Sequence, residues 1–219
     1  MSHKFVITGT DTDIGKTVFS AALMLGLEKA GHSPHYWKPV QSGVEECVDT
    51  KTIQMLTNLP NERFLPERYI FSEPLSPHRA AELDDAKIDI KSLQDINNIP
   101  ACDGSMVIEG AGGLMVPLTR KNLQVNLYKK WNVPLILCAR TGLGTINHTL
   151  LSLEAIWSRG IPLKGIVFIG DENIDNIRTI SEFSDVKILG HLPMLDPLDD
   201  TMLRLIFANN FNIKDFIAV

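Results

Sequence analysis

The stretch from Phe5 to Thr17 contains the residues of this chain that are best suited to chemistry. An apolar run ends in a turn, and Gly15, Lys16 and Thr17 then lead into an apolar, helix-compatible segment. Backbone N–H groups at such a helix start bind phosphate oxygens, the lysine reaches the β- and γ-phosphates, and the hydroxyl binds Mg²⁺. The usual pattern has four residues between its two glycines, whereas five separate Gly9 from Gly15. The order of strand, loop and helix indicates a triphosphate site; the alternative is a chance Gly-Lys-Thr at a helix start.

Lys38 is a second candidate because it stands where another apolar run ends. Pro39 follows it, and Ser42 belongs to the small polar turn beyond. If the run is a parallel strand, its carboxyl end places the lysine ammonium in the same crevice as the phosphate loop. A solvated lysine at an ordinary turn is the alternative interpretation.

Glu109 ends the apolar run that begins at Ser105, and three of the next four residues are glycines. Glycines let the backbone pass close to a ligand. Mg²⁺ is commonly held by one or two carboxylates together with phosphate oxygens and water. Thr17 and Glu109 are therefore candidate ligands, with Asp49 at the head of the next helix as a third. A polar turn at Glu109 and a helix N-cap at Asp49 are the simpler alternatives.

Two further loops follow apolar runs. Residues 140–147 form a glycine-rich turn before a helix whose free N–H groups are able to hold a carboxylate, although loop flexibility also explains the glycines. His148 is interpreted as structural or interfacial rather than as a catalytic base. Residues 190–195 suit the wall of a nucleotide-base site, and the sequence leaves this interpretation open.

The elements that must position these residues alternate between strand and helix. Strands are predicted over residues 4–8, 35–39, 105–109, 133–139, 163–169 and 186–189. Helices are predicted over residues 16–30, 49–58, 91–97, 124–131, 147–159, 173–183 and 199–209. Runs that are nearly continuous in Val, Ile and Leu are typical of parallel strands covered on both faces. We therefore expect a doubly wound α/β fold, with a mainly parallel sheet and ligands at the carboxyl ends of its strands.

Composition excludes several classes of protein. A chain of 219 residues, 44% hydrophobic and 21% charged, is typical of a soluble protein, and we expect residues 1–219 to form a single domain because no linker or repeat divides them. The net charge of −5 argues against a nucleic-acid or membrane surface, and no signal peptide is expected. Cys47, Cys102 and Cys138 fit buried thiols in a reducing cytoplasm rather than a disulfide or metal framework.

Together these segments resemble the dethiobiotin synthetase family. The shared segments, spread from residue 5 to residue 195 in the family's order, are GTDTDIGKT, WKPVQSG, SPH, EGAGGLMVPL, LGTINH and GHLPML. The first segment and EGAGG are specific in combination. Related phosphate-loop proteins of the chromosome-partitioning type carry a lysine early in the loop, where this chain has Asp11.

The resemblance implies a P-loop NTPase-like fold and an ATP- and Mg²⁺-dependent ring closure in biotin synthesis. Family enzymes take 7,8-diaminononanoate and CO₂, form an N-carbamate, and phosphorylate it with ATP to a mixed carbamic-phosphoric anhydride. The second amine then closes the ureido ring. A carbamate attacking a triphosphate brings two anions together, so the site needs the positive charge of Lys16, Lys38 and Mg²⁺.

The resemblance also implies roles for single residues. Lys38 matches the family's active-site lysine, and Ser42 matches a substrate contact. Metal ligands are implied to be Thr17, Asp49 and Glu109. Nucleotide contacts are implied to be Asp13, Ile14, Gly15, Lys16, Thr17, Val18, Asp49, Glu109, Gly110, Ala111, Gly112, Pro193, Met194 and Leu195. Family members are homodimers in which residues 143–148 lie near the partner and the diamine carboxylate, and a cytoplasmic location is expected.

Three positions depart from the family's pattern. Asp13 stands where Glu is frequent, and Gly142 stands where relatives often have a basic residue. Gly170 and Asp171 stand where many members have Asn-Asp, whose asparagine reads the adenine. The preference for ATP over other nucleoside triphosphates therefore stays open.

Two other classes of function are compatible with the phosphate loop. One is a regulatory nucleotide switch, although the Asn-Lys-x-Asp guanine signature is absent from the chain. The other is a phosphotransacetylase-like or cobyrinate-amidating relative, but such relatives usually lie in longer multidomain chains. Diamine-dependent release of phosphate separates the ligase from the switch.

Overall fold

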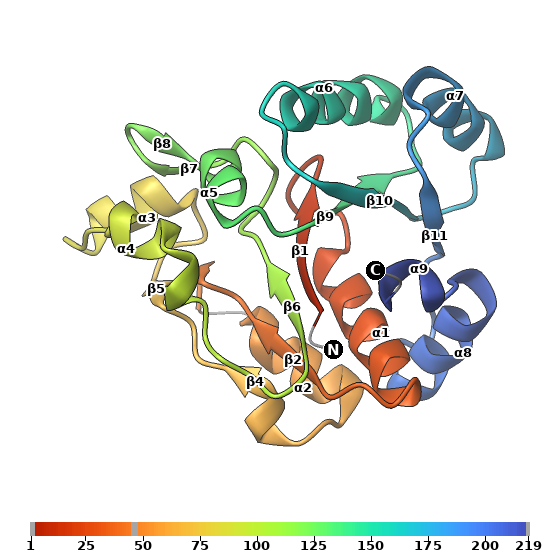
Figure 1. Ribbon diagram of the computed structural model, residues 1–219, viewed down its shortest axis with the longest axis horizontal. Helices are drawn as coiled ribbons and strands as arrows, with labels where there is room; N and C mark the ends of the chain where they lie inside the picture. The colour runs from red at the N-terminus through yellow and green to blue at the C-terminus, as the bar shows by residue number, and fades with distance from the viewer. Residues whose placement is uncertain (1–2, 45–47, 218–219) are drawn as a thin grey trace.

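Seven parallel strands form the central sheet of the computed structural model, which describes residues 3–44 and 48–217 (Figure 1). Their order across the sheet is β11 (Ile188–Leu192), β10 (Leu163–Ile169), β9 (Leu135–Arg140), β1 (Lys4–Gly9), β6 (Ser105–Glu109), β2 (Pro34–Trp37) and β4 (Phe64–Leu65). Every neighbouring pair is parallel. The predicted doubly wound parallel sheet is confirmed.

Helices cover both faces of this sheet (Figure 1). The helices on one face are α1 (Lys16–Lys29), α2 (Asp49–Thr57), α8 (Asp200–Asn210) and α9 (Lys214–Ile217). Those on the other face are α3 (Pro77–Leu83), α4 (Ile90–Gln94), α5 (Gln124–Trp131), α6 (Thr145–Trp157) and α7 (Ile174–Ser184). The 3₁₀ turns are η1 (Asn61–Arg63) and η2 (Ile96–Asn98).

The strand sequences explain this layering. In β1, Phe5 and Ile7 belong to the core under α1, whereas Val6 belongs to the core on the opposite face. In β9, Cys138 belongs to the core under α1, whereas Leu137 belongs to the core on the opposite face. Because successive side chains of a strand point to opposite faces, a strand covered on both sides must be apolar at every position.

Order in the sheet fixes where a ligand binds. The connection from β1 through α1 reaches β2 on one side, and the connection from β6 through α5 reaches β9 on the other side of β1. Ligands of doubly wound sheets bind at the carboxyl ends of the strands where the winding reverses. The loops that follow β1, β2, β6 and β9 therefore share one edge.

Some elements differ from those expected. The second strand ends at Trp37 instead of continuing to Pro39, because a proline has no N–H for the sheet ladder. The helix expected over residues 91–97 is split into α4 and η2, because the Asp95 side chain caps a new turn by accepting from Asn97 N. Elements that were not expected are α3, α9, η1, β4, the parallel pair β3 (Val40–Ser42) and β5 (Tyr69–Phe71), and the antiparallel pair β7 (Pro117–Thr119) and β8 (Asn122–Leu123).

Cysteine burial follows the expectation in part. Cys138 is buried, Cys102 is half-buried, and Cys47 lies outside the described residues. Burial also raises the pKa of the Cys138 thiol, which keeps it protonated. Within residues 3–44 and 48–217, the helices are all too short or too polar to cross a bilayer.

Candidate functional site

The phosphate loop follows β1 and ends in the N-cap of α1. Gly15 has a φ of +90°, and a Cβ there would lie 2.8 Å from the Ile169 side chain, so only glycine fits. Lys16 is buried and its Nζ donates to the Asp11 carbonyl oxygen at 3.3 Å. Burial lowers the pKa of Lys16, although the nearby Glu109 carboxylate opposes this effect. The first turn of α1 presents free N–H groups at this point, as an anion site requires.

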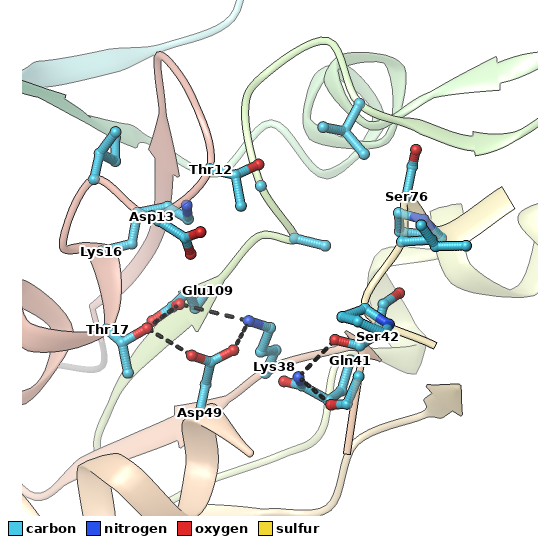
Figure 2. A pocket seen from close by; sticks show the side chains of 18 of the residues that line it. Thr12, Asp13, Lys16, Thr17, Lys38, Gln41, Ser42, Asp49, Ser76 and Glu109 are labelled. Carbon is cyan, nitrogen blue, oxygen red and sulfur yellow. Dashed lines mark hydrogen bonds and ion pairs between the residues drawn. The ribbon is translucent and has the colours of Figure 1, made fainter. Parts of the chain in front are cut away.

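Oxygen atoms from three elements converge beside this loop (Figure 2). Thr17 Oγ1 lies 2.8 Å from Asp49 Oδ1 and 2.9 Å from Glu109 Oε1. Ser20 Oγ donates to the other Glu109 oxygen at 2.8 Å, which fixes the carboxylate. The set is one hydroxyl and two carboxylates, the donor chemistry that Mg²⁺ prefers. The three residues predicted as metal ligands are thus brought together.

Lys38 reaches the same cluster from the end of β2. Its Nζ is paired with Asp49 Oδ2 and lies 3.7 Å from Glu109 Oε1. Burial lowers the pKa of Lys38, but the Glu109 and Asp49 carboxylates outweigh this and leave the pKa above its ordinary value. The ammonium is therefore buried and charged, which rules out the solvated lysine.

A cavity of about 570 Å³ opens in front of this cluster. The phosphate loop forms one side and the segment after β2 forms the other, with Gln41 and Ser42 among its lining residues. Residues 74–77, from the connection after β5 and the first residue of α3, also line the cavity. The hydroxyl oxygen of Ser42 is buried without a hydrogen-bond partner among the residues that the structure describes.

A second cavity, of about 650 Å³, lies on the other side of the phosphate loop. Residues 13–15 line both cavities. Val18, the segment 193–195 and Gly142 line only the second, together with residues that follow β9 and β10. The predicted nucleotide-contacting residues are therefore divided between the two cavities.

The loop after β6 holds the remaining predicted residues. Ala111 and Gly112 line the first cavity with Glu109, whereas Gly110 lines neither cavity. A Cβ at Gly110 would lie 1.9 Å from the Tyr128 hydroxyl, so this glycine allows close packing. His148 is exposed and also lines neither cavity.

Gln124 is a residue that sequence reasoning missed. It is buried at the start of α5, and its Oε1 accepts from Ala111 N at 2.9 Å. Its Nε2 donates to the carbonyl oxygens of Ala111 at 3.1 Å and Gly113 at 3.2 Å. One side chain therefore fixes the loop beside Glu109. Nothing in the local sequence distinguishes this glutamine from any other at a helix start.

Arg140 was also given no role. Its Nη2 donates to the Thr12 carbonyl oxygen at 2.9 Å, so the end of β9 supports the phosphate loop. Arg140 also lines the second cavity. Its position directly after a predicted strand is the only signal that the sequence offers.

Comparison with known proteins gives consistent matches over the whole chain. A family model described as an AAA domain matches residues 3–202. An ATP-dependent dethiobiotin synthetase of Agrobacterium fabrum is 52% identical over 219 residues, covering 100% of this chain and 99% of the relative. One from Rhodopseudomonas palustris strain TIE-1 is 51% identical over 218 residues, with 100% and 99% covered.

Solved structures with the same fold are much more distant in sequence. The septum site-determining protein MinD of Pyrococcus horikoshii, complexed with Mg-ADP, is 14% identical with a TM-score of 0.55, covering 88% of this chain and 82% of that one. A plasmid partition protein of Borrelia burgdorferi, bound to AMPPNP, is 12% identical with a TM-score of 0.56, covering 99% and 96%. These likenesses show the fold alone.

Proposed function

This chain belongs to the dethiobiotin synthetase family, and we infer that it is the ATP-dependent ligase that closes the ureido ring of dethiobiotin in biotin biosynthesis. The observation that carries this conclusion is identity of about half the residues to dethiobiotin synthetases over the full length. The cluster of Lys16, Lys38, Asp49 and Glu109 beside a cavity of about 570 Å³ supports it.

The substrates are 7,8-diaminononanoate, CO₂ and ATP. One amine adds to CO₂ and loses a proton to give a carbamate, and a carbamate oxygen takes the γ-phosphoryl group while ADP leaves. The second amine attacks the carbonyl carbon of the mixed anhydride, phosphate departs, and the ring closes. The protein's contribution to phosphoryl transfer is chiefly positioning and electrostatic stabilisation.

The triphosphate is bound by residues 13–18. The free N–H groups at the start of α1 are proposed to bind the phosphate oxygens, and Gly15 supplies the left-handed backbone conformation at the N-cap of this helix. Lys16 adds a buried positive charge. Contacts from Glu109, Ala111 and Gly112, which line the first cavity, complete the phosphate side.

We propose that Mg²⁺ is held by Thr17, Asp49 and Glu109, because both carboxylates already lie within hydrogen-bond distance of the Thr17 hydroxyl. When bound, Mg²⁺ neutralises charge on the phosphates. The remaining positive charge comes from the chain itself. Lys38 stays protonated because two carboxylates face it, and it stabilises the negative charge of the carbamate as the phosphoryl group transfers.

The diamine occupies the first cavity, with Ser42 as a contact. The nucleotide base occupies the second, against residues 193–195. Gly170 and Asp171, instead of Asn-Asp, stand directly after β10. Asn173 also lines this cavity, but its side-chain oxygen already accepts from Asn176 N, so the base is held mainly by loop backbone and apolar contacts.

The protein is proposed to act in the cytoplasm as a homodimer. Helix α6 leaves Leu151 at 56% exposure and Trp157 at 49%, and Leu143 in the loop before it is fully exposed. An apolar face of this kind suits a second copy of the chain. Replacing Leu151 and Trp157 together by Glu is expected to halve the particle mass measured by light scattering; an unchanged dimer would place the interface elsewhere.

The assay that tests the function mixes the protein with ATP, Mg²⁺, bicarbonate and 7,8-diaminononanoate. Dethiobiotin and phosphate are expected in equal amounts, and omission of the diamine should abolish both. Phosphate release that is indifferent to the diamine would instead support a nucleotide switch.

A further inference from the structure

Gln41 has an amide group whose two ends lie in different surroundings. The residue is in β3, and only 4% of it is exposed. Its Nε2 donates to the carbonyl oxygens of Ser42 at 3.1 Å and Gly43 at 3.0 Å (Figure 2). Because two carbonyl oxygens face this end of the amide, this end must be the nitrogen. The other end is therefore a carbonyl oxygen of fixed orientation.

The carbonyl oxygen of this amide has no hydrogen-bond partner in the part of the chain that the structure describes. Gln41 Oε1 is buried, and no group in residues 3–44 or 48–217 donates a hydrogen bond to it. Gln41 nevertheless lines the cavity of about 570 Å³. A buried acceptor with no donor is costly, so acceptors of this kind are kept where a ligand supplies the donor.

The chemistry of the cavity identifies the donor. Lys38, three residues away, is the nearest cation in sequence, but its ammonium is already paired with Asp49 and Glu109. Phosphate and carbamate oxygens are acceptors and would be repelled by Oε1. What remains is an N–H group of the diamine, and this step rests on the function proposed above.

We propose that Gln41 Oε1 accepts a hydrogen bond from the amine of the diamine that stays free after carbamate formation, and thereby positions it for ring closure. An amide carbonyl suits this role better than a carboxylate would. A carboxylate strongly stabilises the protonated ammonium, which has no lone pair to attack with, whereas a neutral acceptor stabilises it much less and so makes deprotonation easier.

Two variants separate substrate binding from a purely structural role. Gln41→Met removes both the acceptor and the donor, at similar size. Gln41→Lys retains an N–H donor for the carbonyl oxygens of Ser42 and Gly43 but has no acceptor. If Gln41 only holds these carbonyls, the lysine variant should behave like the unchanged protein. If Oε1 binds the amine, both variants should raise the KM for the diamine by roughly tenfold.

Calorimetry with monoamine analogues identifies the amine. The probes are 7-aminononanoate and 8-aminononanoate, each measured against the unchanged protein and the methionine variant. Gln41→Met is expected to lower the affinity for one analogue and for the diamine by the same factor. The affinity for the other analogue and the affinity for ATP should not change. An equal loss of affinity for both analogues, or a loss of affinity for ATP, would overturn the proposal.

A third variant tests the requirement for a neutral acceptor. Gln41→Glu is expected to lower kcat more than it raises KM, and to shift the activity optimum to higher pH, because the carboxylate holds the amine as ammonium. A pH profile identical to that of the unchanged protein would contradict this. If the unchanged protein makes no dethiobiotin, the proposed function fails; if it does and the Gln41 variants match it, only this inference fails.

Discussion

The two cavities on either side of the phosphate loop are built on different principles. The first is lined by charged and polar side chains held in a network that includes Lys38, Asp49 and Glu109. The second also has charged residues in its lining, such as Arg140, but most of the surface that it exposes is apolar, from residues such as Ile169 and Leu195. The side where bonds form therefore depends on the types of its side chains, whereas the side that holds the nucleoside depends on shape.

The largest effect is expected on the charged side. Lys38→Ala should lower kcat by about 10²–10³, the usual loss when a stabiliser of transition-state charge is removed. Steady-state kinetics with saturating diamine measure it. Lys51→Ala, at an exposed position of α2, is the control and should change nothing. An undiminished kcat would remove Lys38 from the proposed mechanism.

A smaller effect is expected at the metal cluster. Glu109→Gln keeps the size of the side chain and an oxygen for Ser20 but removes one negative charge. The Mg²⁺ concentration for half-maximal activity should rise by about tenfold or more, because ligand charge sets affinity for divalent ions. Glu154→Gln, on the exposed side of α6, provides the matched control. Unaltered Mg²⁺ dependence would exclude Glu109 as a ligand.

Changing the nucleotide should have a still smaller effect. A missing side-chain hydrogen bond to the base contributes about 0.5–1.5 kcal/mol, so kcat/KM for ATP should exceed that for GTP or CTP by about tenfold or less. Competition assays with pairs of triphosphates measure the ratio. A preference of several thousandfold would show that a side chain reads the base.

The smallest effect is expected from the apolar wall itself. Met194 is 73% exposed although it lines the second cavity, so Met194→Ala should raise the KM for ATP by no more than about threefold. Met55→Ala, at 65% exposure on α2, controls for general surface effects. A larger rise would mean that the side chain closes over the bound base.

Sequence reasoning succeeded where the geometry of parallel strands decides the outcome. Carboxyl ends of parallel strands share an edge, so the proximity of Thr17, Lys38 and Glu109 was predictable from three separate apolar runs. Their roles stay predictions until they are assayed. The helices with a clear apolar period were also found, with differences of one or two residues at their ends.

Sequence reasoning failed where a long-range contact decides the outcome. The three-residue strands β3 and β5 exist only because they pair with each other, so neither has a periodic signal of its own. Gln124 is a neutral amide whose partners are backbone groups of Ala111 and Gly113, which only the tertiary structure brings to it. Nothing in the neighbouring residues reveals such partners, because propensity and pattern report local preferences.

Among the residues that the structure describes, 13–15 line both cavities. A single small molecule could therefore occupy both cavities, with an acidic group beside Lys16 and Lys38 in the first and a flat apolar ring in the second. Such an inhibitor would need a linker only long enough to pass over residues 13–15. Its selectivity between proteins would come from the charged half, since an apolar ring forms few directional contacts.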